Sequence, residues 1–327
     1  MSDKKIGHTP PNPPPASGVR VPWSAVPARV RSAAEQWLGA RVVEAISQPG
    51  GFSPGAASRL LLSDGRRAFA KAISSDANPQ APAIYRREAK IAGALPPWAP
   101  APRLLWSLDE GEGGWVVLLF EDVAGRQPAQ PWLPAQLEQV LAALVNLGTA
   151  LTPSPLPPAL VGTASEAFTR HVRGWHLLHK DQLSALDPWA ASHLERLIAL
   201  EQQSPAAVAG DTLLHFDVRA DNVLMTNDQV WFVDWPHACV GAVWLDAVLL
   251  APSVTMQGGP PPEQVLDKHP AAAGVDPDAI TAAIVGFAGY LTQRSLLPAP
   301  PGLPTLRAFQ AAQGAVARAW VAQRLAD

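Results

Sequence analysis

The chain contains little of what defines several protein classes. It has one cysteine in 327 residues, Cys239, so an internal disulfide and a CxxC metal site are both excluded, and we expect Cys239 to be a small packing residue. No run of 18 apolar residues occurs, and the N-terminus lacks the apolar core of a signal peptide. Charged residues make up 16% of the chain, the net charge is −3, and long lysine or arginine runs are absent. We therefore expect a cytoplasmic protein with no membrane and no nucleic-acid partner.

Apolar residues make up 48% of the sequence, enough for a sizeable core in one large domain or two lobes. Residues 1–21 are proline-rich and polar, which predicts a disordered tail. Residues 22–122 carry strand patterns with two helices, and residues 123–327 are mainly helical. The expected strands span 41–48, 57–63, 67–73, 104–108 and 115–120. The expected helices span 27–38, 83–95, 134–150, 165–186, 188–203, 277–297 and 305–325. The pattern predicts an α+β protein with a small β-rich lobe followed by a larger helical lobe.

The most informative motif is His215-Phe-Asp217-Val-Arg219-Ala-Asp-Asn222. Its HxDxxxxN spacing matches the catalytic loop of kinases, where the aspartate receives the proton of the acceptor hydroxyl and the asparagine holds a metal ion. Residues 223–233 resemble two short strands around a turn, and this hairpin would return Asp234 to the neighbourhood of Asn222. We predict that Asp217 is the catalytic base and that Asn222 and Asp234 hold Mg²⁺. The alternative, a turn residue and a strand cap, explains neither the asparagine nor the interval.

Other residues of this loop have two interpretations. His215 is expected to brace the backbone rather than to take part in chemistry. Arg219 is predicted to neutralise charge on the transferring phosphoryl group, and the alternative is a surface salt bridge to Asp221. Asp221 itself is expected to be a solvated loop carboxylate rather than a third metal ligand.

The nucleotide is expected to bind in the first lobe. Gly51 and Ser53 lie in a Gly-Gly-Phe-Ser-Pro-Gly stretch between two strand patterns, where glycines let backbone N–H groups approach phosphate oxygens. This stretch is neither GxGxxG nor a P-loop. Lys71, at the end of Arg-Ala-Phe-Ala-Lys, is similar to the lysine of Val-Ala-Ile-Lys, which grips the α- and β-phosphates, and Glu88 is expected to pair with it.

The junction of the two lobes follows the apolar strand pattern that ends at residue 120. Adenine is expected to hydrogen-bond to the main chain there, so we assign Phe120, Glu121 and Val123 to the nucleotide site.

In this order and spacing, the elements resemble the aminoglycoside phosphotransferase and choline kinase-like family, which are small-molecule kinases with a protein-kinase-like fold. The resemblance covers residues 41–250, and its specific part is 214–246. It implies ATP and Mg²⁺ as cofactors, with Lys71 and Glu88 as the ATP clamp, and a monomer or homodimer. It also implies that Asp246 caps backbone N–H groups of the catalytic loop. Asp234 is followed by Trp-Pro rather than Phe-Gly, so the activation switch of protein kinases is absent.

The predicted reaction is transfer of the γ-phosphoryl group of ATP to a hydroxyl of a small molecule. The acceptor is a sugar, an amino alcohol, an aminoglycoside or another natural product. The alternative is a nucleotide-binding pseudokinase that acts as a regulatory or interaction module. Such a module normally lacks one of the key residues, and this chain retains Lys71, Asp217, Asn222 and Asp234.

Charge in the C-terminal part of the chain bears on the acceptor. A polycationic acceptor needs carboxylates around it. Residues 280–326 contain none, and they include Arg294, Arg307, Arg318 and Arg324. This counts against an aminoglycoside, unless the preceding carboxylates line the pocket: Glu263, Asp267, Asp276 and Asp278. A further set of side chains recurs near helical spacing and is expected to pack in the core rather than to line the pocket: His171, Trp175, His176 and His179.

Overall fold

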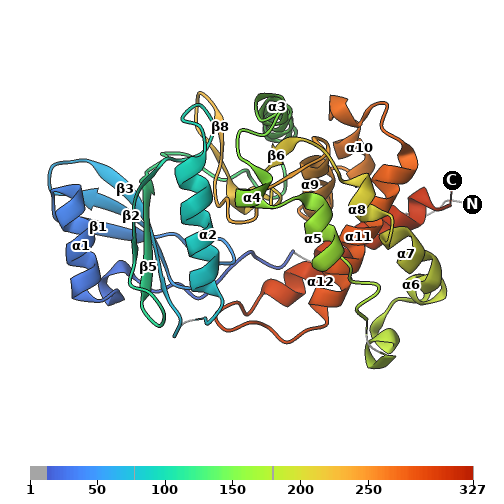
Figure 1. Cartoon of the computed structure of the whole chain (residues 1–327), viewed down its shortest axis with the longest axis horizontal. Coiled ribbons are helices and arrows are strands. Elements are labelled where there is room, and N and C mark those ends of the chain that lie inside the picture. The colour runs from blue at the N-terminus through green and yellow to red at the C-terminus, as the bar shows by residue number, and fades with distance from the viewer. Residues whose placement is uncertain (1–12, 77, 179, 327) are drawn as a thin grey trace, which may run out of the picture.

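The computed structural model describes residues 13–76, 78–178 and 180–326, and it has two lobes (Figure 1). The smaller lobe is built around a five-stranded sheet, and the larger lobe is mainly helical, as the sequence predicts. No helix in the described part of the chain is long and apolar enough to cross a membrane.

The sheet of the smaller lobe is antiparallel with the order β1-β2-β3-β5-β4. Its strands are β1 (Val42–Ser47), β2 (Ala56–Leu62), β3 (Arg67–Ser74), β4 (Leu104–Asp109) and β5 (Trp115–Glu121). Side chains of β5 alternate between the two faces, and both faces are covered. Val117 and Leu119 pack with helix α1 (Ala28–Leu38), whereas Val116 and Leu118 pack with helix α2 (Ala81–Ala94).

Strand β3 lies in the middle of this sheet, and its alternation sets the direction of the key lysine. Ala70 and Ala72 pack on the α1 face, and Ile73 packs on the α2 face. Because neighbouring residues of a strand point to opposite faces, Lys71 points to the α2 face. Only 7% of Lys71 is exposed.

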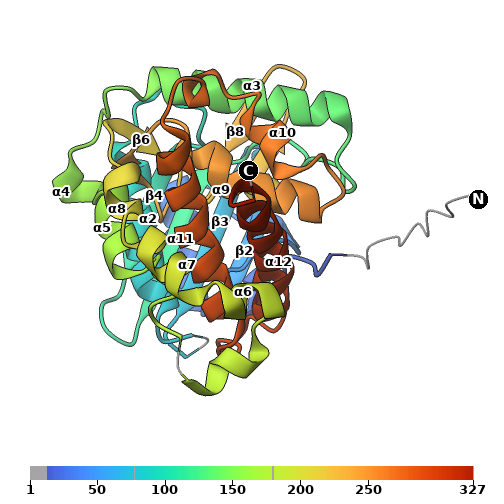
Figure 2. The ribbon, with the colours of Figure 1, turned by 90° about the vertical axis from the view of Figure 1, so that its right-hand side faces the viewer.

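The larger lobe is arranged around one buried helix, α9 (Leu245–Met256), and a long antiparallel pair, α11 (Pro277–Ser295) and α12 (Leu306–Arg324) (Figure 2). Its other helices are α3 (Pro134–Ala150), α4 (Pro158–Val161), α5 (Ala164–Arg170), α6 (Pro188–Ser192), α7 (Leu194–Glu201), α8 (Ser204–Ala207) and α10 (Pro262–Leu266). Two small antiparallel ribbons complete the lobe: β6 (Thr212–Leu214) with β9 (Cys239–Gly241), and β7 (Val223–Met225) with β8 (Val230–Phe232).

The expected helix over 165–186 is wrong beyond Arg170, where α5 ends. The chain leaves the helix so that Gly174 can lie against the backbone of α11, where a Cβ on Gly174 would be 1.8 Å from the carbonyl oxygen of Gly289. The backbone N–H groups of Trp175 and His176 then donate to the carboxylate of Glu201, both at 3.0 Å. The helix expected over 188–203 is likewise divided, into α6 and α7.

The predicted disordered tail is also corrected for residues 13–21, whereas residues 1–12 lie outside the described part of the chain. The backbone of Val21 donates to Gly55, and Gly51 donates to Ala16 at 3.0 Å. Val19 donates to Gly302 of the larger lobe at 2.8 Å. This N-terminal segment therefore connects the glycine-containing loop of the smaller lobe with the loop before α12.

Candidate active site

The catalytic-loop motif lies between β6 and β7, and Asp246 holds its backbone. The carboxylate of Asp246 accepts the N–H groups of His215 at 2.9 Å and Phe216 at 2.8 Å. Phe216 has a φ of 66°, a left-handed conformation that side chains other than glycine adopt at a cost. The contact expected for Asp246 is therefore present, and it fixes the backbone that carries Asp217.

His215 is buried and braces the same loop, as the sequence predicts. Its Nδ1 accepts the N–H of Asp217 at 3.3 Å, and its Nε2 lies 2.9 Å from the carbonyl oxygen of Val233. Nε2 must then carry the proton and donate it to that carbonyl. Through this one ring, the position of Asp217 depends on the residue that precedes Asp234.

Asp217 is held by two neighbours in the loop. Nδ2 of Asn222 donates to the Asp217 carboxylate at 3.0 Å and to its carbonyl oxygen at 2.9 Å, and Arg219 Nη1 donates to the other carboxylate oxygen. Because Asn222 donates through its nitrogen, its carbonyl oxygen is left to accept or to bind a metal.

Arg219 makes the salt bridge to Asp221 that was the alternative interpretation, but that bridge is not on the surface. Two parallel hydrogen bonds of 3.0 Å join the guanidinium to the carboxylate, and the Asp221 side chain is 4% exposed. The expectation that Asp221 is solvated is therefore wrong. Burial lowers the pKa of Arg219, but the charges of Asp217 and Asp221 outweigh this effect and raise it.

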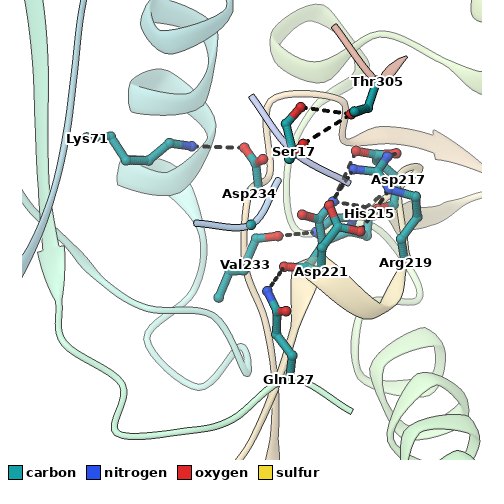
Figure 3. Close-up of polar contacts among 12 residues, drawn as sticks. Ser17, Lys71, Gln127, His215, Asp217, Arg219, Asp221, Val233, Asp234 and Thr305 are labelled. Carbon is teal, nitrogen blue, oxygen red and sulfur yellow. Dashed lines mark hydrogen bonds and ion pairs between the residues drawn. The ribbon is translucent and has the colours of Figure 1, made fainter. Parts of the chain in front are cut away.

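Lys71 lies between two carboxylates, those of Glu88 and Asp234. The motifs require Lys71 of the smaller lobe to meet Asp234 of the larger lobe, and the structure brings them together. The Nζ of Lys71 is 2.9 Å from Asp234 Oδ1 (Figure 3). The same Nζ is 2.5 Å from Glu88 Oε2. Burial lowers the pKa of Lys71, but Asp234 and Glu88 raise it well above its ordinary value. For Asp234, burial acts to raise the pKa. The charge and hydrogen bond of Lys71 outweigh this effect and lower the pKa to about 2. Asp234 is therefore ionised at neutral pH.

The β7–β8 hairpin returns Asp234 to the catalytic loop as predicted. The N–H of Val233 donates to the carbonyl oxygen of Asn222 at 2.9 Å. Asp234 follows with a φ of 69°, a strained conformation of the kind that gathers at functional sites. The hairpin thus places the two predicted metal-binding side chains at adjacent backbone positions.

A cleft between the lobes collects the residues assigned to nucleotide and metal. Its lining includes Gly51, Ser53, Lys71, Glu88, Phe120, Glu121, Val123, Asn222 and Asp234. Gly55 ends the glycine-containing loop with a φ of 100°, and a Cβ there would meet the carbonyl oxygen of Ala72 at 2.6 Å, so only glycine fits. At the lobe junction Arg59 forms a bidentate pair with Asp122 at 2.7 and 2.9 Å.

Sequence reasoning missed two side chains that line this cleft, Arg20 and Gln127, and a buried one that contacts its lining, Tyr85. Arg20, from the N-terminal segment, lies across the loop and donates to the carbonyl oxygens of Gln48, Gly50 and Ser53. The sequence around Arg20 is proline-rich and gives no indication that this side chain binds residues about 30 positions away. Gln127 donates to the carbonyl oxygen of Asp221 at 3.2 Å (Figure 3). Tyr85 has Lys71 Nζ 5.1 Å from its ring centroid. Its position one helical turn before Glu88 was a usable signal.

The residues at this cleft fit a hard divalent cation. Asn222 and Asp234 supply amide and carboxylate oxygens, which Mg²⁺ prefers, and Mg²⁺ usually keeps waters and binds phosphate oxygens for the rest of its shell. Lys71, Glu88 and Asp234 together carry one net negative charge when ionised. Elsewhere among the described residues, no group of three His, Cys, Asp or Glu side chains is arranged to hold a metal.

A second cleft adjoins the first and has about 1680 Å³ of empty space open to solvent. Asp217 and Arg219 line this cleft rather than the first. Phe52 lines the second cleft, although its sequence neighbours Gly51 and Ser53 line the first: its ring centroid lies 5.0 Å from that of Phe309, and the Arg219 guanidinium lies 5.4 Å from it. The hydrogen bond between Asp217 and Asn222 therefore joins one cleft to the other.

Other expectations about the second cleft are partly wrong. His171 lines the cleft, whereas Trp175 is buried and donates to the carbonyl oxygen of Val285 in the core. His176 is exposed, so it neither lines the cleft nor packs in the core as expected, and His179 lies outside the described residues. Cys239 is 3% exposed, and burial raises the pKa of its thiol, as befits a packing residue.

Comparison with known proteins places this geometry among phosphotransferases. Residues 50–281 match the model of a family described as the phosphotransferase enzyme family. No curated protein sequence matches the chain. A choline/ethanolamine kinase family protein from Mesorhizobium loti is 17% identical, with a TM-score of 0.56 over 91% of this chain and 97% of that one. An aminoglycoside phosphotransferase mutant bound to ADP and hygromycin B is 19% identical, with a TM-score of 0.54 over 89% and 98%.

An aminoglycoside phosphotransferase from Alicyclobacillus acidocaldarius is also 19% identical, with a TM-score of 0.50 over 87% of this chain and 92% of that one. At these identities the likeness shows the fold, and it confirms the kinase-like two-lobed arrangement predicted from the sequence.

Proposed function

The chain belongs to the phosphotransferase enzyme family, and we propose that it moves the γ-phosphoryl group of ATP to a hydroxyl of a small molecule, with Mg²⁺ as cofactor. It is a small-molecule phosphotransferase by family; the donor, the metal and the residue roles are the proposal. The observation that carries it is the hydrogen bond between Asp217, in the second cleft, and Asn222, in the first.

The first cleft is assigned to the nucleotide. Lys71, fixed by Glu88, binds phosphate oxygens, and the loop with Gly51 and Ser53 covers them. Asn222 and Asp234 would hold the metal, which when bound would neutralise charge on the phosphates. Lys71 now contacts Asp234 at 2.9 Å, so nucleotide binding requires the ammonium to share its charge between that carboxylate and the phosphates.

The second cleft is assigned to the acceptor, with Asp217 as the base that orients its hydroxyl and takes the proton. Phosphoryl transfer proceeds through a loose transition state, so orientation matters more than basicity. A carboxylate held by both Asn222 and Arg219 suits that task, because its direction is fixed by these hydrogen bonds. Arg219, beside Asp217, is placed to neutralise charge on the group in transfer.

The test compares Asp217→Asn with the control Asp228→Asn, which alters an exposed carboxylate in the turn of the β7–β8 hairpin. ATP turnover is measured across a panel of hydroxyl compounds, with the products identified by mass spectrometry. We expect Asp217→Asn to lose about 10²–10⁴-fold in turnover while it still binds Mg·ATP, and the control to keep both. Near-normal turnover in Asp217→Asn refutes the assignment.

The same assay addresses the pseudokinase alternative. A binding module shows affinity for nucleotide and no transfer to any compound. Pseudokinases normally lack at least one of the four key residues. This chain keeps all four, Lys71, Asp217, Asn222 and Asp234, and Lys71 contacts Asp234. That assembly favours the enzyme.

A further inference from the structure

The charge of the acceptor cleft bears on which molecules it takes. Among the described residues that line it are two carboxylates, Glu166 and Asp217. Four arginines also line it: Arg87, Arg170, Arg219 and Arg294. Four positive charges less two negative ones leave an excess of two positive charges, so a polycationic acceptor would be repelled.

Three of these arginines already have partners within the protein. Arg219 is paired with Asp217 and Asp221. Arg87 donates to three backbone carbonyl groups, of which those of Val161 and Pro236 accept at 2.6 Å. Arg170 lies 4.0 Å from Glu166, one helical turn away on α5. None of the three needs a ligand to satisfy its charge.

Arg294 is different. It is half-buried in the last turn of α11, and its guanidinium lies 5.7 Å from the ring centroid of Tyr290, which also lines the cleft. Over the chain segments that the structure describes, the side chain of Arg294 makes no hydrogen bond and no ion pair besides this contact with the Tyr290 ring. Its five N–H donors are thus available to a bound molecule.

A second arginine adds to the positive charge beside Arg294. Arg307, at the start of α12, donates through Nη1 to Oε1 of the cleft residue Gln310 at 2.8 Å. Burial lowers the pKa of Arg307, and the like charge of Arg294 lowers it further. Arg307 does not itself line the cleft, but its charge acts on Arg294, and two like charges near one another are stabilised when an anion binds beside them.

The carboxylates that might have attracted a cation lie elsewhere. Glu263 is bound by Arg324, at 2.5 and 3.0 Å, and by Trp320. Asp276 caps the N-terminus of α11. Neither of these two lines the cleft, and the same holds for Asp267 and Asp278. A cationic acceptor would find only Asp217 and the exposed Glu166.

We propose that the acceptor carries an anionic oxygen group, a carboxylate or a phosphate, which Arg294 binds with support from Arg307 while Asp217 engages the hydroxyl. The inference rests on the proposed function, since it assigns the second cleft to the acceptor. A guanidinium suits this task because it binds either oxyanion through two parallel hydrogen bonds.

The experiment measures ligand binding in the full chain with Mg²⁺ and a non-hydrolysable ATP analogue present. The probes are hydroxy acids, each paired with its neutral amide: glycerate, glucuronate and quinate. Glycerol 3-phosphate against glycerol forms the phosphate arm, and hygromycin B and ethanolamine form the cationic arm. Dissociation constants come from calorimetry, and the same compounds are then offered with ATP.

We expect at least one acid or phosphate to bind tenfold or more tightly than its neutral partner. Arg294→Gln should remove that preference, a loss of about 10- to 100-fold for a charge-assisted hydrogen bond. Arg294→Lys, which keeps the charge without the planar fork, should retain part of it. The matched control is Arg196→Gln, which alters an exposed arginine on α7 outside the cleft.

The inference is overturned if no anion binds better than its neutral partner, or if the preference survives in Arg294→Gln. Should Arg294→Gln fail to fold, the wild-type comparison of acids with amides still decides. Transfer to hygromycin B or ethanolamine but to no anion overturns this inference and leaves the proposed function standing. Full turnover in Asp217→Asn instead removes the proposed function, and with it the assignment of Asp217 on which this inference rests.

Discussion

Replacing Asp246 by asparagine tests how much of the catalytic loop depends on one buried carboxylate. Asp246 is 3% exposed and accepts two backbone N–H groups, from His215 and Phe216, through separate oxygens. Asparagine offers a single carbonyl oxygen and turns an N–H₂ group toward the other donor. Asp246→Asn therefore keeps one hydrogen bond and leaves one buried donor without an acceptor.

The magnitude follows from those two bonds. A hydrogen bond to a charged group contributes about 1.5–3 kcal/mol, and a buried unsatisfied donor costs about 1–3 kcal/mol. We expect Asp246→Asn to lower the free energy of unfolding by about 2–3 kcal/mol, and Asp246→Ala, which loses both bonds, by about 3–5 kcal/mol. Turnover should fall as well, by about 10²-fold if Asp217 moves by 1 Å.

Urea unfolding and steady-state kinetics measure the two effects. Asp276→Asn is the matched control, because it makes the same change at an exposed carboxylate that accepts a single N–H at the start of α11. Asparagine caps helices as well as aspartate, so this control should stay within about 0.5 kcal/mol of the wild type. If Asp246→Asn also stays within that limit with unchanged turnover, the carboxylate does not hold the loop and the reasoning fails.

Three further predictions concern charge in the core of the molecule. Lys71→Met leaves the buried carboxylate of Glu88 unpaired, so it should destabilise the protein by about 3–5 kcal/mol in urea unfolding, and adding Glu88→Gln should restore stability but not ATP turnover. Chelation of divalent cations should abolish turnover until Mg²⁺ is added back, and Asn222→Ala should raise the Mg²⁺ concentration for half-maximal turnover by at least about tenfold; an unchanged requirement would remove Asn222 from the metal site. Burial raises the pKa of Glu201 from 4.5 to about 7, so between these values the folded protein holds a proton that the unfolded chain releases. The free energy of unfolding of the wild type, relative to Glu201→Gln, should therefore rise as the pH falls from 7 to 5, and a flat difference would contradict this.

The sheet and the long helices could be predicted from the sequence because their signals are local. Alternation along β5 and the apolar period of α3 depend on neighbours within the same segment, and the bounds of α3 agree with the prediction. The convergence of Lys71 with Asp234 could be predicted because motif spacing carries it: a catalytic loop, a short hairpin and a following aspartate leave little freedom. The chemical roles of these residues remain predictions.

What could not be predicted depends on distant partners. The early end of α5 is set by Gly174 against α11, more than a hundred residues away in the chain, and helical propensity around His171 carries no sign of it. Asp221 was expected in solvent because its burial depends on Arg219 folding back onto it. Residues 13–21 have the composition of a disordered segment, yet their backbone groups pair with those of three glycines in other parts of the molecule, Gly51, Gly55 and Gly302.

The pairing of Val19 with Gly302 has a mechanical consequence. Ser17 and Thr305 are joined at the same place by hydrogen bonds of 3.3 and 3.0 Å (Figure 3). Asn78 of the smaller lobe donates to the carbonyl oxygen of Pro301. These hydrogen bonds thus join the two lobes along one side of the molecule. The lobes cannot move apart on that side without breaking these hydrogen bonds. We therefore expect the lobes to open by a rotation about this side, which widens the cleft between them on the opposite side.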